Sequence, residues 1–437
     1  MGDKKRKAKF LALHWQILIG MALGLGWSLV AVRLGWQEWT LDWIKPFGTI
    51  FMRMLKMVAV PLVLVSLIQG VGSLADLSAL SRMGLKTITL YMFTTVVAIS
   101  LGLGLSLAFE PGKALSPQTR EQLLEKYGQG LVEKQTQMTQ QDSGPLQFLV
   151  DLVPENFFKA TSDNTFMLQV IVFALFFGVA LIMVPRERVQ VVRDFFDGAN
   201  DIILKMVDLI MLYAPIGVTG LMAGVLVEIS GNDPSAMSGI LWSLLGYSLT
   251  VVLGLFLLIF GMYPILLMAF LPSYRNWETI RQFYAALMPV QMLAFSTSSS
   301  AATLPLNMER CEETLGLKKQ TVGFVLPLGA TINMDGTSLY QAVATVFIAQ
   351  AFGMDLTLGQ LGTIVLTAVL ASVGSAAVPG AGMVMLVIVL SSIGLSVEGI
   401  SLIMATDRIL DMLRTVANVT SDAVVATMVD AGETKTQ

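Results

Sequence analysis

Long stretches of the chain carry no Asp, Glu, Lys or Arg. A bilayer core about 30 Å thick needs about 20 apolar residues in helical form. Each uncharged stretch can supply at least one crossing: residues 10–32, 57–75, 87–109, 164–185, 209–227 and 237–274. The pattern predicts an all-α membrane protein with several spans.

Charged residues between these stretches predict an orientation. The first stretch follows a basic segment at residues 4–9, and it is longer than a signal peptide and lacks a small-residue cleavage site, which indicates a retained first helix. The positive-inside rule places this segment in the cytoplasm. Alternation then puts both termini in the cytoplasm and the polar segment 110–145 outside, in a multi-pass protein of the cell (inner) membrane.

Two further uncharged runs do not suit a simple crossing. Run 282–308 has a polar centre at 296–303, and run 356–397 has the Gly- and Pro-containing centre 374–382. Inside a helix, glycine costs about 1 kcal/mol and proline about 3 relative to alanine. Because irregular backbone at membrane depth must be buried in protein or line a cavity, both runs are predicted to be re-entrant hairpins with polar surroundings at their tips.

Each predicted hairpin is followed by a segment that carries Asn and Asp, at 333–337 and at 418–422. A hairpin followed by a polar-interrupted helix, occurring twice, is typical of an inverted-repeat transporter with its site near the membrane midplane. We therefore expect both helices to be broken at these segments.

The last apolar segment carries a polar stripe. At about 100° per residue, its five polar members fall within about 80° of one another: Asp407, Asp411, Arg414, Asn418 and Asp422. Charges that face lipid cost about 2.5 to 3.5 kcal/mol each on insertion scales, so the stripe is predicted to face a protein cavity. The alternative is a helix lying on the membrane surface, which the apolar remainder of the segment disfavours.

These carboxylates and Asp335 exceed the positive charge of Arg414, so metal cations, protons or a substrate ammonium must balance them. Hard cations such as Na⁺ need several oxygen ligands, which Asn333, Asp335, Asn418 and Asp422 can supply. The planar fork of Arg414 suits a substrate carboxylate, and Asp411 could hold an ammonium group. Equally, Asp411 and Arg414 could pair with each other.

Composition narrows the function classes. Of 437 residues, 54% are apolar and 14% charged, against roughly a quarter charged in soluble domains. The net charge of −3 lacks the basic surplus of a nucleic-acid binder. One cysteine, Cys311, and one histidine, His14, are too few for a disulfide framework, a zinc site or a histidine-based triad.

Four ordered strings closely resemble the dicarboxylate/amino acid:cation symporter family, which includes the excitatory amino acid transporters and prokaryotic glutamate and aspartate transporters. They are SSSAATLP (298–305), PLGATINMDGT (327–337), VPGAG (378–382) and DMLRTVANVTSD (411–422). The resemblance implies a homotrimeric elevator-type transporter with eight transmembrane helices and two re-entrant hairpins in inverted repeats. Helices 1–2 (1–81) and 4–5 (146–236) would form the scaffold. Helix 3 with the external loop (82–145) and the core from helix 6 to helix 8 (237–437) would move.

The resemblance also implies site residues. For substrate these are Ser298, Ser299, Ser300, Thr337, Val378, Pro379, Gly382, Asp411, Arg414, Thr415 and Asn418. One sodium site would use Gly329, Asn333, Asn418 and Asp422, and a second Thr331, Ser372, Val373 and Ser375. A third would use Tyr91, Thr94 and Thr95 with Asn333 and Asp335.

Arg414 stands where the family's acidic-substrate carriers have arginine, which implies symport of L-aspartate or L-glutamate. Gln341 stands where animal glutamate carriers place a proton-carrying glutamate, which favours Na⁺ over the alternative, a proton-coupled glutamate, aspartate or dicarboxylate symporter. Two rival classes of protein explain less of the pattern. An intramembrane aspartyl protease built on Asp335 and Asp422 would leave Arg414 unexplained, and a passive anion channel would conduct without a sodium gradient.

Some positions depart from the family pattern. The additional arginine that the family places near Asp411 is absent, because Ser298 and Met412 occupy its two usual positions. Arg408 lies one helical turn before Asp411 and could reach it, or it could be an interfacial charge. Ala301, Ala377 and Ser421 replace residues that are commonly serine, glycine and glycine.

Overall fold

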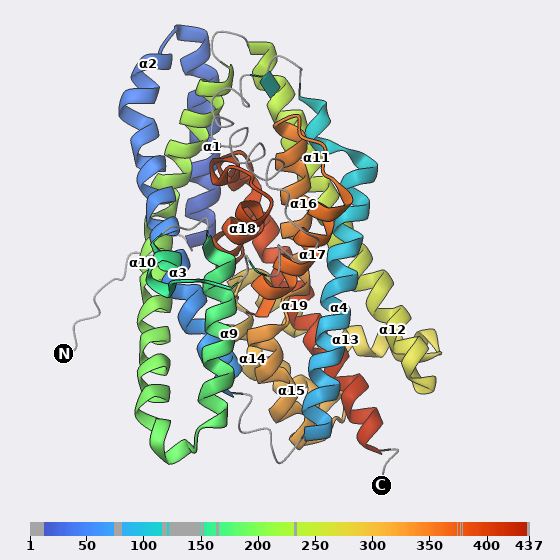
Figure 1. The fold of residues 1–437 in the computed structure, drawn as a ribbon. Coiled ribbons are helices and arrows are strands. Elements are labelled where there is room, and N and C mark those ends of the chain that lie inside the picture. Colours follow the sequence, from blue (N-terminus) through green and yellow to red (C-terminus); the bar gives the residue numbers. More distant parts are fainter. Residues whose placement is uncertain are drawn as a thin grey trace, which may run out of the picture.

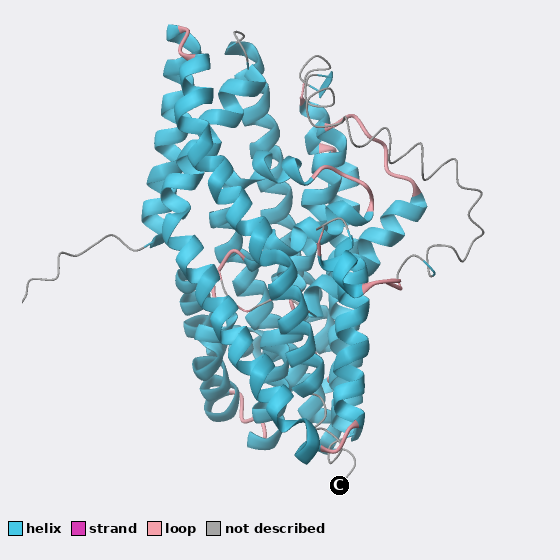
Figure 2. Cartoon of the chain, turned by 60° about the vertical axis from the view of Figure 1, so that its left-hand side comes forward, coloured by secondary structure: helices cyan, strands magenta, loops and turns pink. Residues whose placement is uncertain are grey.

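The computed structural model describes residues 13–73, 81–115, 120–121, 150, 153–162, 166–230, 234–373, 375, 377 and 379–434. Over these residues it contains helices and connecting loops and no strand (Figure 2). The all-α prediction is confirmed for this part of the chain. The basic segment 4–9, most of the predicted external loop 110–145, and Val378 lie outside the described residues.

The helices have the following bounds: α1 Leu13–Leu34, α2 Gln37–Trp39, α3 Lys45–Ser73, α4 Ser81–Phe109, α8 Phe157–Thr161, α9 Met167–Met183, α10 Arg186–Ser230, α11 Pro234–Leu257, α12 Tyr263–Phe270, α13 Trp277–Thr297, α14 Ser300–Glu309, α15 Lys319–Ile332, α16 Asp335–Ala351, α17 Leu358–Val373, α18 Ala381–Ser392 and α19 Ile400–Thr434. Short π-helical turns, Thr40–Ile44 and Leu258–Met262, join α2 to α3 and α11 to α12.

Five helical segments in the described chain are long and apolar enough to cross a membrane: Trp15–Leu34, Gln37–Gln69, Met83–Ala114, Arg186–Glu228 and Ser238–Phe270. All five overlap a predicted uncharged stretch, and the second also includes the charged residues Glu38, Asp42, Lys45, Arg53 and Lys56. Stretch 164–185 forms the shorter apolar segment Gln169–Met183. Several apolar helices therefore make this a multi-pass membrane protein.

Three long helices, α1, α3 and α10, pack tightly on one side of the bundle (Figure 1). Glycines permit the close approach: a Cβ on Gly20 would lie 2.5 Å from the Pro215 carbonyl oxygen, and one on Gly48 would lie 2.4 Å from the Leu221 nitrogen. Small residues let helix backbones meet in this way in membranes. These three helices form a closely packed unit.

Helix α16 is the centre of the remaining bundle. Every residue of α16 is buried, and α4, α11, α17, α18 and α19 contact it. A helix that is enclosed on all sides must satisfy its polar side chains with partners on neighbouring helices. The polar residues of α16 and α19 therefore determine what these helices can bind.

Both predicted hairpin centres contain non-helical residues. Helix α13 ends at Ser298, whose φ of 53° is left-handed, and the Ser299 hydroxyl then accepts the Ala302 N–H at 3.2 Å to begin α14. Between α17 and α18 the backbone turns at Gly380, with φ 79°. Each pair of helices packs together across its turn.

The two predicted interruptions have different outcomes. The chain leaves the helix at Asn333 and Met334, between α15 and α16, as expected. The predicted break at 418–422 is wrong, because α19 runs without interruption from Ile400 to Thr434. This helix has no proline and no glycine before Gly432, and the Thr420 hydroxyl donates to the Val416 carbonyl at 2.7 Å, so its polar residues are accommodated within the helix.

Candidate substrate and cation site

The two hairpin tips touch each other and the polar stripe of α19. The Ser299 hydroxyl donates to the Ala377 carbonyl oxygen at 2.8 Å, and the Ala301 N–H donates to the same oxygen at 3.4 Å. From the second tip, the Gly380 N–H donates to Asp411 Oδ2 at 3.1 Å. Segments about 80 and 110 residues apart in sequence therefore converge on α19.

The stripe is enclosed by protein. All five of its members, Asp407, Asp411, Arg414, Asn418 and Asp422, are buried. The alternative of a surface helix with a solvated polar side is therefore wrong. Buried ionic groups of this kind require partners, and each has them on α19 itself or on α15, α16 or the hairpin tips.

Arg414 is completely buried, and its guanidinium is closely packed. Its Cζ lies 3.8 Å from the Tyr340 ring centroid, a cation–π contact. A Cβ on Gly382 would lie 3.1 Å from Arg414 Nη1, so a larger residue there would require the guanidinium or the backbone to shift. These contacts fix the plane of the guanidinium.

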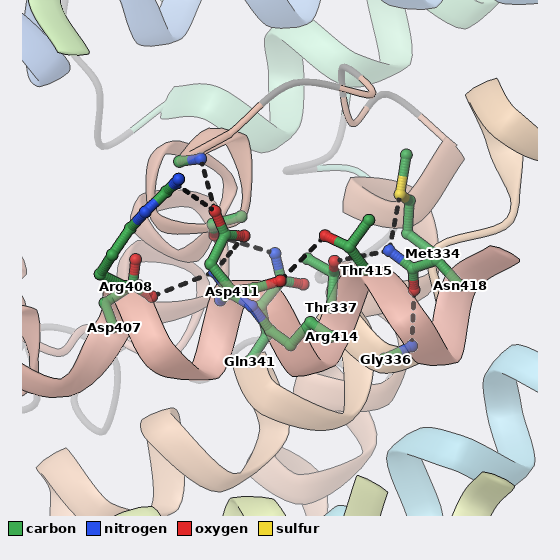
Figure 3. A network of polar contacts seen from close by, with 12 residues as sticks. Met334, Gly336, Thr337, Gln341, Asp407, Arg408, Asp411, Arg414, Thr415 and Asn418 are labelled. Carbon is green, nitrogen blue, oxygen red and sulfur yellow. Dashed lines mark hydrogen bonds and ion pairs between the residues drawn. The ribbon is translucent and has the colours of Figure 1, made fainter. Parts of the chain in front are cut away.

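One nitrogen of Arg414 serves two carboxylates (Figure 3). Nη2 lies 2.7 Å from Asp411 Oδ1 and 3.1 Å from Asp407 Oδ1, so the possibility that Asp411 and Arg414 pair with each other is realised. Arg414 Nε and Nη1 have no hydrogen-bond acceptor among the described residues. Buried donors are nearly always bonded, so these two nitrogens are positioned for a further acceptor.

Asp411 is shared among three cationic or N–H groups. Oδ1 accepts from Arg414, whereas Oδ2 accepts from the Gly380 N–H and lies 3.6 Å from Arg408 Nη1. Arg408 is only 8% exposed, so it is not an interfacial charge. It lies beside Asp411, which is the other of the two expected positions.

Asn418 connects the stripe to the start of α16. Its Oδ1 accepts the Gly336 N–H at 2.8 Å, and its Nδ2 donates to Thr337 Oγ1 and to Met334 Sδ, each at 3.2 Å. The Thr415 hydroxyl donates to the Asp411 carbonyl at 2.9 Å. The structure thus brings most of the predicted substrate residues into one network around Asp411 and Arg414.

The predicted tip residues lie at the edge of this network. Ser298 and Ser300 are buried in the first tip, and the hydroxyl of Ser299 is directed to the second tip rather than to α19. Pro379 is half-buried and immediately precedes Gly380, whose N–H reaches Asp411.

A second polar cluster surrounds Asp335, which is fully buried. Its Oδ1 accepts from the Thr95 and Thr94 hydroxyls at 2.7 and 3.3 Å. Its Oδ2 accepts from the Ser421 and Tyr263 hydroxyls at 2.6 and 3.1 Å. Hydroxyl oxygens can turn their lone pairs toward a cation, so four oxygens and a carboxylate are available in one place.

Asp422 forms the neighbouring cluster. Its Oδ1 accepts from Asn333 Nδ2 at 2.9 Å, and a Cβ on Gly329 would lie 2.3 Å from both that oxygen and the Tyr91 hydroxyl. Asn333 Oδ1 is buried without a donor among the described residues. The Tyr91 hydroxyl therefore lies beside Asp422 and not among the hydroxyls that bind Asp335.

The predicted cation groupings are only partly assembled. Asn418 binds α16 instead of joining Asp422, although Gly329 and Asn333 do lie beside Asp422. Ser372 Oγ accepts the Met334 N–H at 3.0 Å and donates to the Ile332 carbonyl at 3.3 Å, at the α15–α16 break. The remaining members of that predicted site are less close: Thr331 is exposed, Val373 is half-buried at the end of α17, and the Ser375 N–H bonds to the Ser372 carbonyl.

The buried charges do not cancel. Among the residues that the structure describes, four carboxylates are buried, on Asp335, Asp407, Asp411 and Asp422, but only two guanidiniums, on Arg408 and Arg414. Both arginines lie at Asp407 and Asp411, so within the described chain Asp335 and Asp422 have no ion pair. Uncompensated buried charge is very costly, so these two carboxylates call for a bound cation or a proton.

The potential metal ligands that the described residues place around Asp335 and Asp422 are oxygen atoms. The described part of the chain contains no cluster of three His, Cys, Asp or Glu residues that could hold a metal ion such as zinc. Carboxylate, hydroxyl, amide and carbonyl oxygens are the ligands of hard cations. The clusters fit an alkali cation better than a transition metal.

Several residues of the site were not assigned a role from sequence. Tyr340 stacks on Arg414 and lies one turn after Thr337, so its position on the same face of α16 was an available signal. Asp407 belongs to the stripe but was not identified as a partner of Arg414. Tyr263 lies in an apolar stretch with no local signal of its contact with Asp335.

Comparison with known proteins gives consistent results. The model of the sodium:dicarboxylate symporter family matches residues 13–431. Excitatory amino acid transporter 4 of Mus musculus is 34% identical over 98% of this chain and 83% of its own length, and excitatory amino acid transporter 3 of Mus musculus is 36% identical over 95% and 85%. The proton/sodium-glutamate symport protein of Bacillus subtilis (strain 168) is 33% identical over 98% of this chain and 94% of its own. The chain therefore belongs to the sodium:dicarboxylate symporter family, whose members are membrane transporters and not enzymes.

Proposed function

We propose that the protein is a secondary active symporter that takes up acidic amino acids, L-aspartate or L-glutamate, together with Na⁺. The observation that carries this proposal is the buried pair of Arg414 and Asp411 beneath the two hairpin tips. One cation and one anion at 2.7 Å match the side-chain carboxylate and the ammonium of an acidic amino acid.

Substrate binding is then an exchange of partners. The substrate carboxylate accepts from Arg414, whose Nε and Nη1 find no acceptor within the described chain, and the ammonium takes the place of Arg414 at Asp411 Oδ1. Asp407 stays on Arg414 Nη2, and the Tyr340 ring keeps the guanidinium in plane. Neither charge is left unpaired, which avoids the several kcal/mol that an isolated buried charge costs.

The coupling ion is Na⁺ in this proposal. Asp335 and Asp422 lack cationic partners in the described chain and are surrounded by oxygen ligands, as an alkali cation requires. Gln341, whose Nε2 donates to the Gly382 carbonyl at 3.3 Å, cannot carry a proton. The alternative is a proton-coupled glutamate, aspartate or dicarboxylate symporter, in which these two aspartates take protons. The name of the Bacillus subtilis relative mentions both ions.

Movement follows an elevator scheme in this proposal. Residues 1–81 and 146–236 form a static scaffold, whereas 82–145 and 237–437 carry the site across the membrane. Glycine-mediated packing of α1, α3 and α10 supports a rigid scaffold, and the network that joins α4, α12, α16 and α19 through Asp335 supports a unit that moves as one body. The proposed arrangement also has eight crossings and two re-entrant hairpins. The protein is a homotrimer in the cell (inner) membrane, and its termini are cytoplasmic.

Uptake by purified protein in liposomes tests this function. Labelled L-aspartate is offered with an inward gradient of Na⁺, of H⁺, or with K⁺ inside, each imposed separately. The proposal predicts accumulation only with the Na⁺ gradient. Accumulation driven by H⁺ alone would support the alternative, and peptide cleavage or a sodium-independent current without uptake would refute symport.

A further inference from the structure

Arg408 is a second buried arginine at Asp411, and the substrate exchange described above does not use it. It lies one turn before Asp411 on α19 and is 8% exposed. Its Nη1 lies 3.6 Å from Asp411 Oδ2, within an ion pair but beyond hydrogen-bonding distance. In the described part of the chain, neither its Nε nor its Nη1 finds a hydrogen-bond acceptor.

Arg408 lies beside the same carboxylate group that an ammonium would approach (Figure 3). Asp411 Oδ2 already accepts the Gly380 N–H and faces Arg408, while Oδ1 faces Arg414. An ammonium bound to Asp411 is therefore a close neighbour of the Arg408 guanidinium. Like charges within about 4–6 Å of each other shift binding equilibria by about tenfold or more.

Charge balance gives the complementary effect on anions. Asp407, Arg408, Asp411 and Arg414 together carry two negative and two positive charges. Neutralising Arg408 would leave this group with one excess negative charge, which repels a dianion and attracts an ammonium. The charge of Arg408 thus acts in opposite directions on the two kinds of substrate group.

We infer that Arg408 sets the selectivity between substrates that carry an ammonium group and dicarboxylates that lack one. It weakens the hold of Asp411 on an ammonium and strengthens the hold of the site on a second carboxylate. This inference rests on the proposed function, and it makes Arg408 a positioning residue that acts through Asp411.

The test is calorimetric binding of L-aspartate and of succinate, in the same Na⁺ concentration, to the purified full-length protein. Two variants remove the charge, Arg408→Gln and Arg408→Met, and Arg408→Lys keeps it. The matched control is Arg281→Gln, because Arg281 is an exposed arginine on α13 that lies 3.9 Å from Glu278. The ratio of the two dissociation constants is compared within each preparation, so a reduced fraction of folded protein does not change it.

We expect the succinate-to-aspartate ratio of Kd values to rise about tenfold or more in both neutral variants. It should stay near the wild-type value in Arg408→Lys and in Arg281→Gln. A ratio that stays constant while both affinities fall together would show a merely structural role and overturn the inference. A change of the ratio in Arg408→Lys as large as in the neutral variants would also overturn it. If the wild type binds aspartate but no succinate, the inference fails and the proposed function stands. If it binds no acidic amino acid, both fail.

Discussion

Arg414 Nη2 lies 2.7 Å from Asp411 Oδ1, and both side chains are buried. A pair of this kind is neutral as a unit. A ligand with both an ammonium and a carboxylate can supply a new partner to each group at once. In the proposed function, this relationship favours a substrate that carries both groups.

Replacing Arg414 by cysteine should abolish binding of acidic amino acids. Loss of a buried charge partner costs about 3–5 kcal/mol, which corresponds to a loss of affinity of about 100-fold or more. The shorter, neutral side chain leaves room for a neutral side chain of the substrate, so uptake of serine or alanine should appear. Competition of each amino acid with labelled aspartate measures both changes. Normal aspartate transport by Arg414→Cys would remove the role that we give to this residue.

Asp422→Asn should lower the apparent affinity of transport for Na⁺, with little effect on folding. The amide oxygen can still accept from Asn333, but the negative charge that faces no cationic partner in the described chain is lost. We expect the Na⁺ concentration for half-maximal uptake to rise about tenfold or more, by analogy with charge effects on proton binding. Asp208→Asn is the control, since Asp208 is an exposed residue of α10 that pairs with Lys205 at 3.1 Å. An unchanged sodium dependence in Asp422→Asn would contradict the assignment.

Gly329→Ala should damage the same site sterically. The new methyl group would lie 2.3 Å from both Asp422 Oδ1 and the Tyr91 hydroxyl, so both side chains or the backbone of α15 must move. We predict a reduced apparent Na⁺ affinity and a lower Tm. Gly323→Ala lies on the same helix α15, where nothing is within 4 Å of the added atom, and it should behave as the wild type. Equal effects of the two substitutions would indicate a general response of α15.

Gln341→Glu should introduce a pH dependence. Gln341 Nε2 donates to the Gly382 carbonyl, and a protonated glutamic acid can do the same, whereas a carboxylate would face that oxygen without a hydrogen. Sodium-driven uptake by the variant should be retained at low pH and be lost as pH rises through the titration of the new group. Uptake by the wild type should change little over the same range. The comparison is made with a fixed Na⁺ gradient, and identical pH profiles would argue against this contact.

Helix breaks that depend on local chemistry are predictable from the sequence. Ser298, Gly380 and the Asn333–Met334 pair all interrupt helices as predicted, since glycine, proline and clustered small polar residues disfavour a continuous helix. The prediction is wrong at 418–422, where Asn and Asp residues suggested a break that the uninterrupted helix α19 does not have. Polar residues alone do not break a helix when neighbouring elements supply their partners.

The single-face stripe of α19 was predictable because it depends only on helical periodicity. Which residues of other helices face it was not, because that depends on packing. The contacts of Tyr340 with Arg414 and of Tyr263 with Asp335, and the attachment of Asn418 to α16 rather than to Asp422, all arise between helices. Residue type indicated the chemistry of these positions, and tertiary structure determined their grouping.

Sodium-coupled symport is tested by measuring labelled aspartate and labelled Na⁺ simultaneously in the same proteoliposomes. The account predicts that Na⁺ enters only when an acidic amino acid is present, that aspartate accumulates only when Na⁺ is present, and that the two fluxes keep a fixed ratio. Aspartate accumulation without Na⁺ entry, under an H⁺ gradient alone, would contradict it.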